Sequence, residues 1–151
     1  MRSRHYVVTT VLAVYTALLL LALLAPTSNE QSGMVVWLGD ALTRLGLPDW
    51  ATRFQRLEVV MNALIIAPVT FLGSILRPSY GWRSWTAYGF AASLTVEVIQ
   101  LVVLPGRHPS FSDVVANTLG ALLGAVLFQL MRALISAAGP ASARKRAETK
   151  P

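Results

Sequence analysis

Four apolar stretches constrain the fold of this chain more than any other feature. They run from Tyr6 to Ala25, from about Glu58 to Leu76, from about Ser84 to Leu104 and from about Ser112 to Ser136. About 20 helical residues suffice to cross the ~30 Å hydrocarbon core of a membrane. The composition agrees, because 54% of the 151 residues are hydrophobic and only 13% are charged. The sequence therefore predicts an all-α, multi-pass membrane protein with four transmembrane helices.

The first stretch could in principle be a cleavable signal peptide, because Arg2 and Arg4 precede it. Its apolar run of about 20 residues exceeds the usual length of about 7–15 in signal peptides. The sequence LLAPTSN that follows also lacks a small-x-small cleavage site. An uncleaved anchor is the favoured interpretation.

The basic residues that flank the stretches predict an orientation with both termini in the cytoplasm. Lysine and arginine are enriched in cytoplasmic loops, and this orientation places nine of the 13 basic residues inside. The nine inside are Arg2, Arg4, Arg77, Arg83, Arg132, Arg144, Lys145, Arg146 and Lys150. The four outside are Arg44, Arg53, Arg56 and Arg107. Because these residues flank membrane spans and form no surface interleaved with aromatic residues, no nucleic-acid partner is expected.

Two further segments are predicted outside the spans. In the external loop 26–57, an amphipathic helix places Val35, Leu38, Leu42 and Leu45 on one side. It could lie on the outer leaflet or pack over the mouth of the bundle, and the sequence leaves both interpretations open. The transmembrane domain is predicted to span residues 1–140, followed by a basic, disordered cytoplasmic tail at 141–151.

Polar side chains interrupt three of the four stretches, all in the half nearer the predicted external side. They are Asn62 on the second stretch, Glu97 and Gln100 on the third, and Asp113 and Asn117 on the fourth. Residues three or four apart share one face of a helix. An acid in the middle of a membrane costs about 2.5–3.5 kcal/mol on insertion scales. We therefore expect these side chains to face one another in an outward polar pocket, with Arg107 as the counter-ion.

Several of these residues also have purely structural interpretations. Ser110 and Asp113 match a helix-capping signature, and Asn62 and Asn117 could serve only to hydrogen-bond neighbouring helices. Pro68 predicts a kink. Gly120 and Gly124 form a G-x-x-x-G pattern that allows close helix contact, within the chain or with a second copy. Glu97 is the strongest functional candidate, because an acid within a membrane span usually has a function.

In their order along the chain, these residues resemble the VanZ-like family of bacterial membrane proteins. The family pattern is Asn…Pro, Glu-x-x-Gln, an arginine in the next loop, Asp-x-x-x-Asn and Gly-x-x-x-Gly. The matching residues here are Asn62 and Pro68, Glu97 and Gln100, Arg107, Asp113 and Asn117, and Gly120 and Gly124. The family tends to have glycine two residues after the proline, where this chain has Thr70. The resemblance implies a location in the bacterial cytoplasmic membrane, and the family's named member is associated with resistance to the glycopeptide antibiotic teicoplanin.

Three classes of function follow. The favoured one is a non-enzymatic cell-envelope factor whose pocket engages a lipid head group, a lipid-linked cell-wall precursor or a glycopeptide antibiotic. The alternative is a membrane-embedded enzyme that acts on a lipid-linked substrate, with Glu97 and Asp113 as an acid–base pair or as ligands of a divalent ion. A transporter is the third, although four helices without an inverted repeat would need to oligomerise. No cofactor and no resident metal are expected, and the chain has no cysteine for disulfides or thiolate sites.

Overall fold

In the computed structural model, residues 2–23, 29–104 and 110–148 are described, and within them the chain forms helices and no strands. The helices are α1 (Arg2–Leu23), α2 (Asn29–Arg44), α3 (Asp49–Thr52), α4 (Phe54–Leu76), α5 (Trp82–Val103) and α6 (Phe111–Glu148). Of these, α1, α4, α5 and α6 are long and apolar enough to cross a membrane. The prediction of an all-α protein with four transmembrane helices is confirmed.

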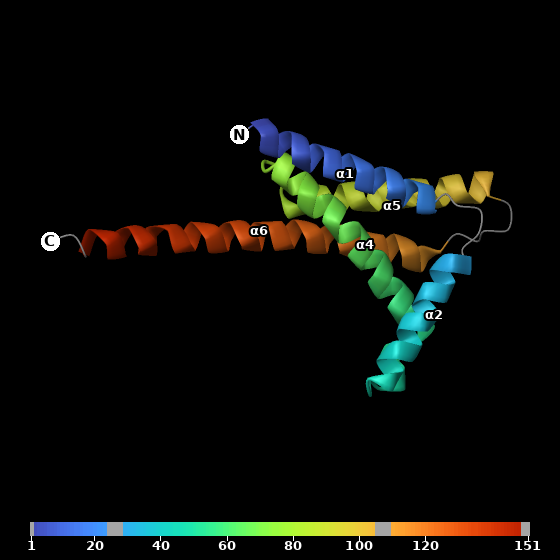
Figure 1. Ribbon diagram of the computed structural model, residues 1–151. Coiled ribbons are helices and arrows are strands. Elements are labelled where there is room, and N and C mark those ends of the chain that lie inside the picture. The colour runs from blue at the N-terminus through green and yellow to red at the C-terminus, as the bar shows by residue number, and fades with distance from the viewer. Residues whose placement is uncertain (1, 24–28, 105–109, 149–151) are drawn as a thin grey trace.

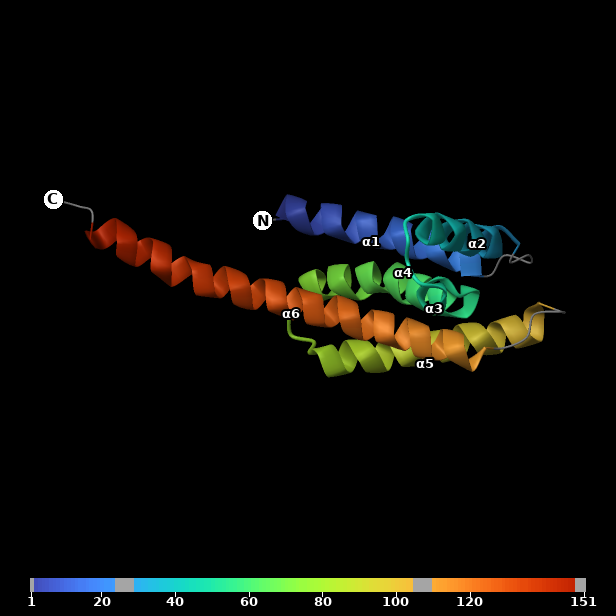
Figure 2. The same cartoon turned by 90° about the horizontal axis from the view of Figure 1, so that it is seen from below.

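The four long helices pack side by side in the order α1, α4, α6, α5. Helix α6 lies between α4 and α5, whereas α1 packs on the other side of α4 (Figure 2). The start of α1 and the end of α6 lie at the same end of the bundle (Figure 1). Four long helices that run back and forth through the bundle bring the chain back to the end at which it starts. The central position of α6 explains why its residues, more than those of the other helices, form the core: Val114, Ala116, Ala121, Ala125 and Phe128 are buried.

Two glycines allow α6 to approach the backbone of α4. A methyl group at Gly120 would overlap the carbonyl oxygen of Ala63, and one at Gly124 would overlap that of Ala67. Further along, Phe71 and Phe128 meet edge to face with ring centroids 6.1 Å apart. The glycine face of α6, for which the sequence leaves open a contact within the chain or with a second copy, therefore packs against α4 of the same chain.

Helix α1 is tied to α4 next to a proline. Pro68 lies inside α4, and because proline has no N–H, the carbonyl of Leu64 loses its helical donor. The hydroxyl of Tyr15 on α1 donates to the neighbouring carbonyl, that of Ile65, across 2.8 Å. The contact between the two helices is thus anchored at the turn that the proline disturbs.

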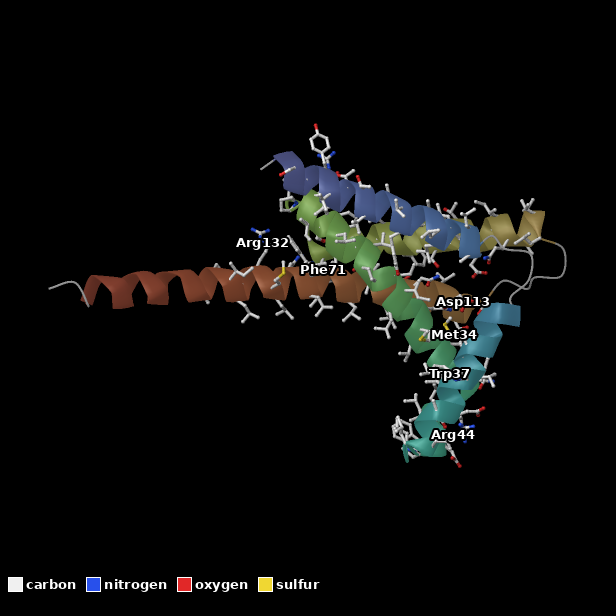
Figure 3. All side chains as sticks on the ribbon, in the orientation of Figure 1. Met34, Trp37, Arg44, Phe71, Asp113 and Arg132 are labelled. Atoms are coloured by element: carbon white, nitrogen blue, oxygen red, sulfur yellow. The ribbon has the colours of Figure 1, made fainter. Side chains whose placement is uncertain are left out.

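The amphipathic segment predicted between the first two spans is α2. Its Val35 and Gly39 are buried, and Gly39 lies against Thr52 at the end of α3 and Leu57 in the first turn of α4. The side of α2 that carries them therefore packs over the bundle. Met34 and Trp37 are exposed (Figure 3), so apolar surface also remains for contact with a leaflet. Leu45, expected on the packed side, is exposed because α2 ends at Arg44.

Helix α6 is longer than the sequence analysis predicts. Its apolar part runs from Phe111 to Ala137, close to the predicted span, but the helix continues to Glu148. The disorder and the cytoplasmic location expected for residues 141–151 stay predictions, although the helix extends into this segment. The physical reason for the extension lies in the composition of ASARKRAE, which is rich in the strong helix formers alanine, arginine, lysine and glutamate.

Candidate functional site

The polar side chains predicted from the sequence come from α4, α5 and α6 at the end of the bundle opposite the two termini. Asp113 lies where α4 crosses α6 (Figure 3). On α5, Ser93, Glu97 and Gln100 follow one another at spacings of four and three residues, and all three are buried. This spacing places them on one face of the helix. Because α5 packs mainly on α6, that face is turned toward α6. We call Asn62, Ser93, Glu97, Gln100, Asp113 and Asn117 the polar cluster.

Asn62 and Asp113 connect α4 to α6. The Nδ2 of Asn62 donates to Oδ1 of Asp113 across 2.8 Å, although 51 residues separate them in the chain. Asp113 lies in the first turn of α6, where a negative charge is favoured by the helix dipole. The favourable position of Asp113 at the start of α6 and its contact with a second helix therefore exist together.

Glu97 connects α5 to the start of α6. Its Oε2 accepts a hydrogen bond from the backbone N–H of Ser110 across 2.9 Å, and only 8% of the residue is exposed. Ser110 directly precedes α6, and the first N–H groups of a helix have no partner within the helix. The buried carboxylate therefore satisfies a donor at the start of α6 that has no partner within the helix.

Asn117 makes the third connection, again between α6 and α5. Its Nδ2 donates to the hydroxyl of Ser93 across 3.0 Å, in a fully buried position. Ser93 is not among the site residues predicted from the sequence. The signal that identifies it is its position four residues before Glu97, on the face of α5 that also carries Gln100.

The sequence of the chain matches a known protein family. A family model described as VanZ/LLP1 matches residues 6–132. The chain belongs to the VanZ/LLP1 family. The match covers most of the spanning part of the four long helices and includes every residue of the polar cluster, so the resemblance stated from the sequence is confirmed. No curated protein and no solved structure shows significant similarity to the chain.

The cluster of this VanZ/LLP1 chain lies on two sides of α6. The bond of Asp113 to Asn62 is on the side of α4, whereas the bonds of Glu97 and Asn117 are on the side of α5. Helices α4 and α5 barely touch each other. The structure thus brings the predicted residues together through α6, as pairs. Gln100 is buried beside them, while Arg107 and His108 lie outside the described residues, so the proposed ion pair of Glu97 with Arg107 stays a prediction.

Acidic groups gather at this end of the VanZ/LLP1 chain. Glu58 on α4 lies close enough to Asp113 for their like charges to interact, and Glu97 adds a third carboxylate from α5. Within the described parts of the chain, no three histidine, cysteine, aspartate or glutamate side chains are grouped closely enough to hold a metal ion. The chemistry that this arrangement offers is recognition of a positive charge by carboxylates, with amides and hydroxyls beside them.

The same chain carries buried hydroxyls in the other half of α4. Thr70 donates to the carbonyl of Ala67 and Ser74 to that of Thr70, at 3.2 and 2.7 Å. Both therefore satisfy their hydrogen bonds within their own helix. They need no partner from another helix, in contrast to the members of the polar cluster.

Proposed function

We propose that this VanZ/LLP1 chain is a non-enzymatic cell-envelope factor of the bacterial cytoplasmic membrane. Its polar cluster faces outward and engages a positively charged group of a lipid head group, a lipid-linked cell-wall precursor or a glycopeptide antibiotic. The observation that carries this proposal is the buried carboxylate of Glu97, held by a backbone donor at the membrane end where most acidic residues of the chain occur.

The distribution of charge supports the outward orientation. Six of the seven acidic residues lie between Glu30 and Asp113, on the segments that face the cluster end. In the sequence, the nine basic residues predicted inside flank the opposite ends of the four spans, and Glu148 is the only acid in these flanking segments. Because basic residues are retained on the cytoplasmic side of membranes, this asymmetry favours a cluster that opens to the outside.

The chemistry of the cluster suits a ligand that carries an ammonium group. Hydrogen bonds between a cation and a carboxylate are about twice as strong as those between neutral groups, and a low dielectric strengthens them further. The pairing of Asn62 with Asp113 and of Ser110 with Glu97 fixes the orientation of both carboxylates before a ligand arrives. Such preorganisation lowers the entropic cost of binding.

The direct test is expression of the chain in a glycopeptide-susceptible bacterium, followed by the inhibitory concentration of teicoplanin. The proposal predicts a rise of at least fourfold relative to a host with the empty vector. Asp49→Asn removes an exposed acid outside the cluster and should leave that rise intact. If the wild-type protein is present in the membrane and teicoplanin sensitivity does not change, the antibiotic is excluded as a ligand.

One observation favours the enzymatic alternative. Glu58 lies one helical turn before Asn62, whose amide bonds to Asp113, so two carboxylates lie near each other, and neighbouring carboxylates are one arrangement used in general acid–base catalysis. Turnover of a lipid-linked cell-wall precursor by the purified protein, abolished in Asp113→Asn, would favour catalysis over binding.

A further inference from the structure

We propose that the end of the bundle opposite the polar cluster binds the phosphate head group of an anionic phospholipid. Three arginines lie at or beside the short loop between α4 and α5: Arg77, Arg83 and Arg132. All three are exposed. The chain has no aspartate or glutamate from residue 59 to 96 or from 114 to 147, so this end has no acidic neighbour for them within the described segments. The inference does not depend on the function proposed for the polar cluster.

Arg132 is held beside the loop by two contacts. Its Nη1 donates to the carbonyl of Pro78 across 3.3 Å, and its guanidinium lies over the ring of Phe128, 5.7 Å from the centroid. Figure 3 shows the side chain extending from α6 toward the end of α4. A guanidinium has five donors, and the Pro78 carbonyl uses one of them. Arg132 is thus positioned at the loop with donors left for an anion.

The other two arginines stand at the two ends of the same loop. Arg77 directly follows α4, and its backbone N–H caps that helix through Gly73. Arg83 lies in the first turn of α5, with its guanidinium over the ring of Trp82, 5.1 Å from the centroid. Because only five residues, 77–81, separate the two helices, the positive charges are concentrated around one loop.

Aromatic side chains place this loop at the depth of lipid head groups. The rings of Tyr80, Trp85 and Tyr88 pack together with centroids 5.8–6.2 Å apart, and a side chain at Gly73 would collide with the indole of Trp85. Tyr80 and Tyr88 are nonetheless exposed. Tyrosine and tryptophan concentrate at the membrane–water interface, which is where phospholipid phosphates lie. A lipid phosphate is therefore the anion that this surface fits.

The three charges predict selectivity for anionic over zwitterionic lipids. Arginine matches a phosphate through two parallel hydrogen bonds, and each basic residue near an anionic leaflet adds about fivefold in affinity. A zwitterionic head group brings its own cation and gains much less. We therefore expect a preference for phosphatidylglycerol over phosphatidylcholine of about fivefold or more.

Tryptophan quenching by brominated lipids tests this preference. The chain has four tryptophans, so Trp37→Phe with Trp50→Phe leaves Trp82 and Trp85 as reporters at the proposed site. The full-length protein is reconstituted in phosphatidylcholine with increasing fractions of brominated phosphatidylglycerol. If the site prefers phosphatidylglycerol, tryptophan fluorescence should already be quenched when brominated phosphatidylglycerol is a small fraction of the lipid. The triple variant Arg77→Gln/Arg83→Gln/Arg132→Gln lacks all three charges and should bind the two lipids about equally. Arg44→Gln, at the other end of the bundle, should leave the preference for phosphatidylglycerol unchanged.

Equal quenching by the anionic and zwitterionic brominated lipids in the reporter protein would overturn the proposal, whether or not the triple variant folds. An unchanged preference in a triple variant of normal helicity would also overturn it. Millimolar inorganic phosphate should displace little of the lipid. Complete loss of the preference on its addition would assign the site to a soluble anion and contradict a lipid occupant.

Discussion

Asn62 on α4 donates a hydrogen bond to Asp113 on α6 across 2.8 Å, and this bond links the two most closely packed helices of the bundle. Interhelical hydrogen bonds in membrane proteins contribute about 0.6 kcal/mol on average and up to about 1.7. A double-mutant cycle with Asn62→Ala and Asp113→Ala should therefore give a coupling of about 0.5–2 kcal/mol in unfolding by SDS. Additive effects would show that the bond contributes nothing.

Gly120 should tolerate no larger side chain. A methyl group there overlaps the carbonyl oxygen of Ala63, a backbone atom that cannot rotate away, and overpacking typically costs about 1–3 kcal/mol. Gly120→Ala should lower the free energy of unfolding by about that amount. Gly33→Ala is the matched control, because open space surrounds Gly33 on α2. Equal stability of the two variants would contradict the close contact of α6 with α4.

Asn117 and Ser93 should respond unequally to truncation. Asn117→Ala creates a cavity in the core and removes the donor to Ser93, so we expect it to lower abundance in the membrane. Ser93→Ala removes only a hydroxyl and leaves the amide of Asn117 without that acceptor, at a cost of about 1–3 kcal/mol. Immunoblots of membrane fractions and thermal unfolding in detergent would measure both. A more severe effect of Ser93→Ala would contradict this ranking.

The orientation can be measured with single cysteines, since the chain has none of its own. A cysteine at Ser32, near the cluster end, should react with an impermeant thiol reagent in intact cells. A cysteine at the exposed Ser79, in the loop between α4 and α5, should react only after lysis. The opposite pattern would place the polar cluster in the cytoplasm.

The spans of the long helices were predictable because a helix that crosses the membrane needs an apolar stretch as long as the hydrocarbon core is thick. The length of each helix was not, because a helix can continue into water when its residues favour it, as α6 does to Glu148. Helix α4 begins at Phe54, four residues before the predicted start at Glu58, and the whole helix is apolar enough to span. Hydropathy reports where lipid surrounds a helix and does not report where the helix ends.

The members of the polar cluster were predictable, but their partners were not. Asn62, Glu97 and Asn117 stand out because each interrupts an apolar run. Which of them meet depends on the order in which the helices pack, and α6 separates α4 from α5. Glu97 bonds to a backbone N–H of Ser110, a group that every residue except proline possesses and that no sequence pattern identifies.

We propose that Glu97 acts through its charge, and Glu97→Gln separates the charge from the hydrogen bond. The glutamine keeps an oxygen that can accept the hydrogen bond from Ser110, so the protein should insert at normal abundance, whereas Glu97→Leu removes the acceptor as well and should also lower stability. The decisive measurement is the inhibitory concentration of teicoplanin in cells with equal membrane levels of wild type and Glu97→Gln. We predict that Glu97→Gln returns it to the value of the empty-vector host. Full resistance in Glu97→Gln at the wild-type level would contradict the account and leave Glu97 with a structural role alone.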